Sequence, residues 1–594
     1  MKLKYRAFAA LLALVSLSSC KDFLDKVPDT RVYLQNVEQL RELMVDGYSS
    51  HSYACVGELS SDNVIDNNSP SDNGVRYNRA PYSAFDEQLY RWEPVTMGSD
   101  SDSPTGLWEG YYGAIASCNA VLEKCYEFEE AMATPEGPLS ETDLQKLQSI
   151  KGEALISRAF HHFILANVFC MPYAGPELSK SLQGIPYITE PETKVKPHYD
   201  RGTLANVYDH IEADIIEGVE LINDGLYEVP KYHFNKAAAY AFAARFYLFK
   251  REYEKVVDYA TKAFKGNDPA TMMNDLWYNS SFYYISDIGR YATRMANASN
   301  IMLISSYSTW WRRFVSSGRF ACNRMAKRAS IQGPGPAWEN CRYRNTKTGE
   351  TFAMMPCFNG YCGTAGGQEY GTYFAGTCFE QFEYTDKIAS IGYCHAIRAE
   401  FTTEQILLMR AEAYLYLGQK DLAFADLRLW NEAHRNGSNE NHLELTEDQI
   451  VKFYTKCLTK YVQNSRRTDL KEKYSDSIFF GIAKPIHIDE ICPSDKYKAT
   501  DELMPWLQCC QHFNRIETAH TGYRWFDIKR LGLEVEHKYG FSDVYWLVSG
   551  DTRYAVEVPA SAIQAGLEPN NNTPKNSPMQ APVESKGTYV QINN

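Results

Sequence analysis

The sequence predicts a mainly α-helical fold: one large domain with helix pairs as its scaffold, long irregular loops and a few short strands. Two segments, 237–264 and 406–437, each contain an Ala-rich helix, a turn and a second amphipathic helix. Loops rich in Pro, Gly, Asn and aromatic residues separate the helical segments, and one run, 300–307, has strand character. Hydrophobic residues make up 44% of the 594 residues, enough to fill a large core.

Residues 1–19 have the pattern of a signal peptide. Three basic residues, Lys2, Lys4 and Arg6, precede an apolar run that ends in small residues. Cys20 follows these residues directly, which is the arrangement that a bacterial lipoprotein signal requires. We therefore predict cleavage before Cys20, lipidation of its thiol and stable anchoring of a mature domain over 20–594. The alternative is an ordinary secretory signal followed by an accidental cysteine.

The rest of the composition excludes two classes of protein. No other apolar run reaches the length of about 18 residues that a membrane-spanning helix needs. The net charge of −13 argues against nucleic acid binding, because phosphate recognition needs clustered Lys and Arg. The same charge favours neutral or cationic ligands.

The two helix pairs align with each other at an offset of 167 residues. This offset matches Ala244 with Ala411 and Tyr247 with Tyr414. Small residues at these positions let paired helices approach closely, as in tetratricopeptide units. A third pair is expected near 107–170, where helices over 107–124 and 150–170 should pack together.

The cysteines allow more than one interpretation. Besides Cys20, fourteen remain. No Cys-x-x-Cys pair occurs, which disfavours a zinc site. Disulfides in a loop-rich region outside the cytosol and buried free thiols both remain open. Six cysteines fall within one Gly-rich region: Cys322, Cys341, Cys357, Cys362, Cys378 and Cys394.

Two end motifs carry a family resemblance. The start Cys20-Lys21-Asp22-Phe23-Leu24-Asp25, with Pro28 after it, resembles the Cys-x-x-(Phe/Tyr)-Leu-(Asp/Glu) leader of SusD/RagB-like lipoproteins of Bacteroidetes nutrient-uptake systems. Near the other end, residues 522–530 (GYRWFDIKR) resemble that family's Gly-x-Arg-Trp-Phe-Asp-Leu-x-Arg element. The preceding Arg515 and Glu517 match only part of the family pattern, because its second acidic residue is missing.

The resemblance implies a SusD-like single domain and a function. Such proteins are surface-exposed, lipid-anchored lipoproteins of the outer membrane that cap a SusC-like TonB-dependent transporter, without a cofactor or catalysis. Known members bind glycans or, in the RagB branch, peptides. We interpret the motif at 522–530 as a fold signature and not as a binding site. In this interpretation Arg524 and Asp527 pair on one helical turn, and Trp525 and Phe526 are buried.

Candidate ligand-binding residues lie mainly in the long region 277–395. Sugar rings are bound by exposed aromatic faces flanked by polar groups. Trp310, Trp311 and Arg312 fit this description best, directly after the strand at 300–307. The alternative is that both tryptophans pack under the loop. Trp338 and Tyr283 are secondary candidates.

The N-terminal loop supplies three further candidates, Asp62, Asn63 and Trp92. Calcium binding at Asp62 and the acidic residues that follow it, or at 100–103, is disfavoured because Pro70 and Pro104 fall where a ligand should be. Solvated turns are the simpler interpretation of these acidic stretches.

The leading hypothesis is a surface glycan-binding lipoprotein that delivers oligosaccharides to its transporter. A peptide-binding lid of the RagB type is the main alternative. A secreted glycoside hydrolase would need two carboxylates at a suitable separation, which sequence alone neither reveals nor excludes. A structural assembly protein is the remaining alternative.

Overall fold

The computed structural model describes most of the chain. It covers residues 36–70, 75–132, 139–193, 198–274, 285–315, 318–322, 326, 333–339, 342–344, 351–353, 378–434, 443–465, 481–570, 579–580 and 590–593. The predicted signal peptide and Cys20 lie outside these residues, as does Tyr283.

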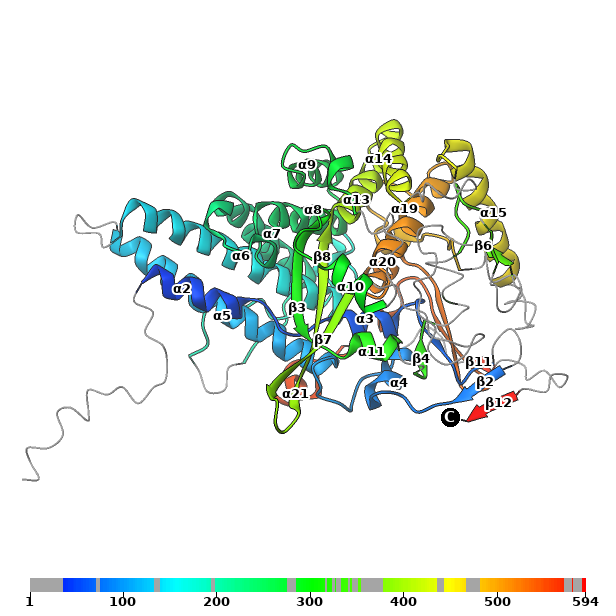
Figure 1. Ribbon diagram of the computed structural model, residues 1–594, viewed down its shortest axis with the longest axis horizontal. Helices are drawn as coiled ribbons and strands as arrows, with labels where there is room; N and C mark the ends of the chain where they lie inside the picture. Colours follow the sequence, from blue (N-terminus) through cyan, green and yellow to red (C-terminus); the bar gives the residue numbers. More distant parts are fainter. Residues whose placement is uncertain are drawn as a thin grey trace, which may run out of the picture.

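Helices dominate the described residues, and the strands are short (Figure 1). The helices are α2 (Val37–Leu43), α3 (Ala54–Ser60), α4 (Ala84–Tyr90), α5 (Pro104–Met132), α6 (Glu141–Phe169), α7 (Leu204–Leu221), α8 (Lys236–Lys250), α9 (Tyr253–Ala263), α10 (Ile285–Ala292), α11 (Trp310–Val315), α13 (Thr403–Tyr416), α14 (Lys420–Ala433), α15 (Glu447–Ser465), α18 (Ile488–Ile491), α19 (Met504–Glu517), α20 (Tyr523–Leu531) and α21 (Ala560–Gln564). The strands are β1 (Ile65–Asp66), β2 (Val75–Asn78), β3 (Asn300–Tyr307), β4 (Phe320–Ala321), β5 (Arg342–Arg344), β6 (Thr351–Ala353), β7 (Cys378–Asp386), β8 (Ile391–Thr402), β9 (Val535–Tyr539), β10 (Asp543–Leu547), β11 (Met579–Gln580) and β12 (Val590–Asn593).

The helix boundaries follow local sequence signals. The side chain of Asn235 accepts a hydrogen bond from the amide of Ala238 and caps α8, and Arg251 in a left-handed conformation (φ 63°) ends that helix. Thr402 caps α13, and Gly418 (φ 73°) makes the turn between α13 and α14. The two helix pairs expected over 237–264 and 406–437 are therefore present, with their turns where the sequence placed them.

The long helices α5 and α6 pack against each other, as expected for the region 107–170. Their contact is polar as well as apolar. Arg158 of α6 forms an ion pair with Asp214 of α7 at 2.7 Å and donates a hydrogen bond to the Asn119 side chain of α5 at 2.9 Å. Arg158 thus joins three neighbouring helices, at a site where buried charges are fully paired.

A three-stranded antiparallel sheet, in the order β3-β8-β7, crosses the middle of the molecule between these helices and the C-terminal helices (Figure 1). The strand predicted at 300–307 is confirmed as β3. Strands β7 and β8 were not predicted. They form a long hairpin that begins inside the long region 277–395 and extends past its end.

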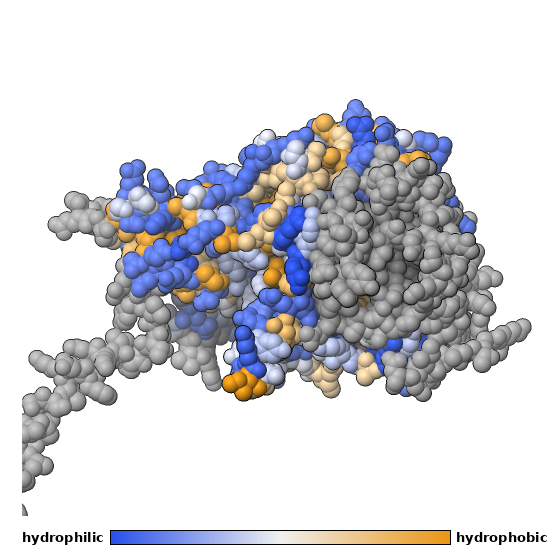
Figure 2. All heavy atoms as spheres, viewed as in Figure 1, coloured by the Kyte–Doolittle hydropathy of each residue, from blue (hydrophilic) through white to orange (hydrophobic). Residues whose placement is uncertain are grey.

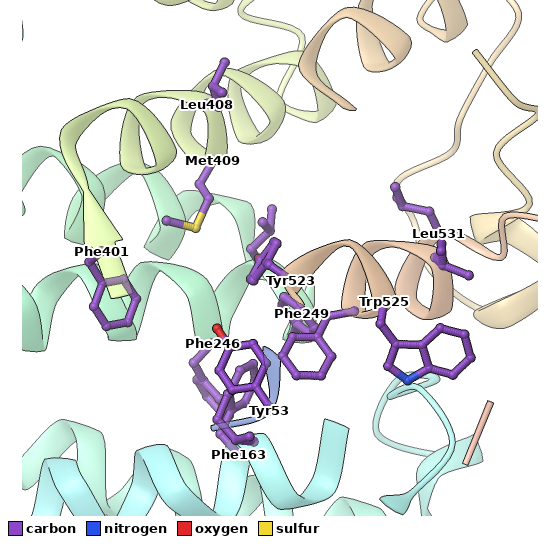
Figure 3. Packing of buried hydrophobic residues seen from close by; sticks show 14 of the residues in the cluster. Tyr53, Phe163, Phe246, Phe249, Phe401, Leu408, Met409, Tyr523, Trp525 and Leu531 are labelled. Atoms are coloured by element: carbon purple, nitrogen blue, oxygen red, sulfur yellow. The ribbon is translucent and has the colours of Figure 1, made fainter. Parts of the chain in front are cut away.

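Most buried apolar residues form one continuous core. Figure 3 shows aromatic side chains from distant parts of the chain meeting there, among them Tyr53, Phe163, Phe249, Tyr523 and Trp525. Together with the dominance of helices, this single core confirms the predicted mainly α, single-domain fold.

Helix α20, which contains the 522–530 motif, lies inside this core. Trp525 and Phe526 are buried as expected. The expected ion pair between Arg524 and Asp527 is wrong, because each side chain has a different partner. Arg524 binds Asp62 at 2.9 and 3.1 Å, whereas Asp527 accepts from Arg530 at 2.8 Å and from Asn514 at 2.8 Å. The motif therefore holds distant segments together, as a fold signature does.

Candidate functional site

Three of the four tryptophans predicted to contact a sugar are buried: Trp92, Trp310 and Trp338. Trp310 is 1% exposed and Trp338 is 0% exposed, with its indole N–H donated to the carbonyl of Gly333 at 3.0 Å. Trp92 donates its indole N–H to the carbonyl of Ser60 at 2.9 Å and stacks on the ring of His537. The expectation that these three rings face a ligand is contradicted by their burial, and they serve as core residues.

Asp62 and Asn63 also have structural roles instead of the expected ligand contacts. Besides Arg524, the Asp62 carboxylate contacts Lys484 at 2.7 Å and Arg515 at 3.3 Å. Asn63 is buried and accepts a hydrogen bond from Arg515 at 3.0 Å. Burial by itself would raise the pKa of Asp62, but the three cations hold it well below the usual value.

Some predictions fall on parts of the chain that the structure does not describe. Trp311 and Arg312 belong to α11, but their side chains lie outside the described residues, as do Tyr283 and Cys20. So do Cys341, Cys357, Cys362 and the side chain of Cys378. The disulfide alternative therefore stays a prediction. Eight cysteines elsewhere are free and buried: Cys55, Cys118, Cys125, Cys170, Cys457, Cys492, Cys509 and Cys510.

The acidic stretch at 100–103 is not arranged for a cation. Asp102 is buried and accepts hydrogen bonds from the Ser308 hydroxyl and from the amide and hydroxyl of Thr309, at 2.5, 2.9 and 2.8 Å. Across the described residues, no group of three or more His, Cys, Asp or Glu side chains is placed to hold a metal ion. The local bonds instead fix the start of α11 against the start of α5.

One face of the β3-β8-β7 sheet carries exposed aromatic and polar side chains. Side chains alternate between the two faces of a strand. Ser306 of β3 and Ala396 of β8 point into the core and are buried, while Tyr307 and Tyr393 are 39% and 55% exposed. The register of the sheet places Ser305, Tyr307, Tyr393, His395 and Glu383 on this face, which we call the tyrosine face.

The side chains of the tyrosine face contact one another across all three strands. The ring centroids of Tyr307 and Tyr393 are 5.3 Å apart and tilted by 56°. His395 lies 4.6 Å from the Tyr307 ring, within 3.5 Å of the Ser305 hydroxyl and 2.7 Å from the Glu383 carboxylate. These contacts limit the rotation of each side chain, so the face is ordered before any ligand arrives.

The two ends of the tyrosine face are different. At one end α10 packs on β7, and Arg290 lies over the Phe379 ring at 5.0 Å. At the other end the β7–β8 hairpin projects from the body, and Figure 2 shows an apolar cap on it where Ile388 is 99% exposed. The open stretch between these ends is several side chains long.

The chemistry of the tyrosine face suits a hydroxyl-rich ring. Tyrosine rings pack against apolar C–H surfaces, and carboxylate, imidazole and hydroxyl groups exchange hydrogen bonds with hydroxyls. None of these residues is a candidate ligand-binding residue from the sequence alone. The alternation of small or apolar with polar residues in 391–402 was the available signal for the strand that presents Tyr393 and His395.

Among the described helices, none combines the length and apolar character that crossing a bilayer requires.

A comparison with family models finds a match over part of the chain. Residues 22–248 match the sequence model of the SusD-like family described as starch-binding and associating with the outer membrane. No curated protein has significant sequence similarity to the chain.

Solved structures share the fold over nearly the whole chain. A SusD superfamily protein from Bacteroides vulgatus aligns with a TM-score of 0.53 and 17% identity, covering 91% of this chain and 100% of its own. A SusD superfamily protein from Bacteroides thetaiotaomicron aligns with a TM-score of 0.50 and 16% identity, covering 90% and 100%. Residues 22–248 are thus similar to this family in sequence, and the chain shares its fold with SusD superfamily proteins over nearly its whole length.

Proposed function

We propose that this protein is a cell-surface, lipid-anchored binding protein that captures oligosaccharides and acts as a lid, delivering them to a SusC-like TonB-dependent transporter. The observation that carries the proposal is the tyrosine face, where two exposed, mutually contacting tyrosines are flanked by a hydroxyl, an imidazole and a carboxylate. The family description as starch-binding supports a carbohydrate ligand, and its association with the outer membrane supports the location.

The lid mechanism rests on tethering. The lipid at Cys20 would hold the domain beside the transporter, which raises the effective concentration of the bound sugar at the transporter mouth. Fifteen residues, 21–35, lie between Cys20 and the first described residue, Asn36. An extended segment of that length spans up to about 55 Å, enough for the domain to swing away and return. No catalytic step is part of the proposal.

The test is a titration of residues 21–594 with neutral hexasaccharides (maltohexaose, laminarihexaose and xylohexaose) and with a set of mixed peptides. Tyr307→Ala and Tyr393→Ala should each weaken glycan binding about tenfold, since a lost aromatic contact is worth about 1.4 kcal/mol. Tyr384→Ala is the matched control, because this exposed tyrosine lies on the opposite face of the same hairpin.

Each other result would contradict the proposal. Binding of peptides alone would assign the protein to the RagB-like branch, and hydrolysis of any hexasaccharide would make it an enzyme. Equal losses in all three variants would remove the tyrosine face as the binding surface. Metabolic labelling with palmitate tests the anchor separately, since Cys20→Ala should abolish it.

A further inference from the structure

Arg313 of α11 is a buried cation with an unusually complete set of partners. Its guanidinium binds Asp86 at 2.9 Å, the Ser83 hydroxyl at 2.9 Å and the Thr309 hydroxyl at 3.1 Å. Asp100 lies 3.5 Å and Asp102 3.6 Å away. These partners come from the start of α4, the turn before α5 and the segment after β3. Arg313 thus connects α11 and the residue Thr309 before it to two segments that lie more than 200 residues earlier in the sequence.

Two groups beside Arg313 face solvent. The Tyr82 ring lies over the guanidinium at 4.5 Å and is 49% exposed, so one face is held by the cation while much of the ring is open. The side chain of Asp100 is 45% exposed. Its two oxygens accept from the Ser83 hydroxyl and the Asp102 amide, both at 3.1 Å, which leaves further lone pairs for a ligand.

This pair lies close to the tyrosine face. Ser308 and Thr309, the two residues after Tyr307, both bind Asp102, and Asp102 in turn is two residues from Asp100. The ring of Tyr82 and the carboxylate of Asp100 are therefore on the segments that adjoin the end of β3. Within this cluster three aspartates face one arginine, so the local charge is negative.

We propose that Arg313 is a positioning residue that holds Tyr82 and Asp100 as a fixed ring-and-carboxylate pair for an uncharged sugar ring. The proposal rests on the proposed function and narrows it to neutral glycans. The open side of Tyr82 stacks on the sugar, and Asp100 accepts hydrogen bonds from its hydroxyl groups. A uronic acid at the same place meets like charge from the aspartates and is rejected.

The experiment uses the neutral hexasaccharide that the wild-type chain 21–594 binds most tightly, with hexagalacturonic acid as the anionic probe. Tyr82→Ala and Asp100→Asn should each weaken neutral binding about tenfold, whereas Tyr82→Phe should bind as wild type. Asp100→Asn should also raise the affinity for hexagalacturonic acid. Tyr126→Ala is the matched control, because Tyr126 is another exposed tyrosine with a cation, Lys151, 4.7 Å from its ring.

Arg313→Lys separates positioning from general stability. It keeps the charge but loses the fork that binds several partners at once. We expect weaker neutral binding in the wild-type background and no further loss in the Tyr82→Ala/Asp100→Asn background. The positioning role would be overturned if Arg313→Lys reduced the affinity for neutral glycan equally in both backgrounds and also lowered the thermal midpoint of unfolding in both.

Failure of this inference is distinguishable from failure of the proposed function. If wild type binds a hexasaccharide through Tyr307 and Tyr393 but Tyr82→Ala and Asp100→Asn bind equally well, only the inference is overturned. If wild type binds no glycan, both are overturned. Should Arg313→Lys fail to fold, the Tyr82 and Asp100 variants still decide whether the pair binds sugar.

Discussion

Asp62 offers a direct test of whether the N-terminal loop binds ligand or holds the fold together. Its carboxylate is the shared anion of Arg524, Arg515 and Lys484, and its side chain is almost fully buried. Asp62→Asn keeps the shape of the side chain but leaves these cations without a carboxylate. Breaking a buried ion pair in this way costs about 3–5 kcal/mol, because the remaining charge is neither solvated nor compensated.

The assay is urea unfolding followed by tryptophan fluorescence, with the free energy of unfolding taken from the midpoint and slope. Asp258→Asn is the matched control, since Asp258 pairs with Lys262 at 2.7 Å on an exposed helix surface. That pair is worth about 0.3–0.5 kcal/mol. We expect Asp62→Asn to lose several times more stability than the control.

The same variant separates the two roles of Asp62. If Asp62 is structural, the folded fraction of Asp62→Asn binds glycan with unchanged affinity. An unfolding free energy within about 1 kcal/mol of the control, together with lost binding, would refute the reasoning from the buried network. Because the pKa of Asp62 is held below its usual value, its contribution to stability is present at neutral pH and is lost only as the pH falls below about 4.

Two further predictions concern buried groups of the scaffold. His161 and His162 each accept a backbone N–H at Nε2, from Ser49 and Ile188, and burial lowers both pKa values, that of His161 to about 4. The unfolded chain takes up these protons near pH 6.5, so the free energy of unfolding should fall by up to about 2 kcal/mol per histidine between pH 7 and pH 5, measured by urea unfolding at each pH; a flat profile would contradict this. A Cβ on Gly57 would lie 2.2 Å from the carbonyl oxygen of Gly522, so Gly57→Ala should cost about 2–3 kcal/mol. Gly418 lies at a left-handed turn with open space around it, so Gly418→Ala should cost only about 1 kcal/mol. Equal thermal midpoints for the two variants would show that the close approach of Gly57 to Gly522 is not needed for stability.

The sequence predicted the elements whose signals are local. Ala-rich helices with a turn residue between them, such as α8 and α9 around Arg251, carry their own caps and periodicity. The strand β3 was equally visible from its apolar run. The hairpin of β7 and β8 was missed because its alternation is irregular and interrupted by a tight turn at 387–390.

The candidate site could not be predicted because exposure depends on partners far away in sequence. Trp310 lies beside Arg312 and Arg313, a composition typical of a surface, yet Arg313 is neutralised by aspartates more than 200 positions earlier. In the sequence, Asp62 resembles an exposed loop carboxylate, but in the structure it is the hydrogen-bond partner of Arg524. Residue types alone do not distinguish a charge that binds ligand from one that binds the protein itself.

The network around Asp62 also constrains the order in which the chain can assemble. The bond from Arg524 to Asp62 closes a span of 462 residues, and that from the Gly522 amide to Glu58 closes 464. During synthesis, the N-terminal segment therefore emerges from the ribosome long before its partners have been made. Contacts of such sequence separation form late, because the chain must first lose the entropy of a very large loop. The segment that is made first would be among the last to reach its native place, so a chain truncated before residue 515 should remain open and vulnerable to proteases.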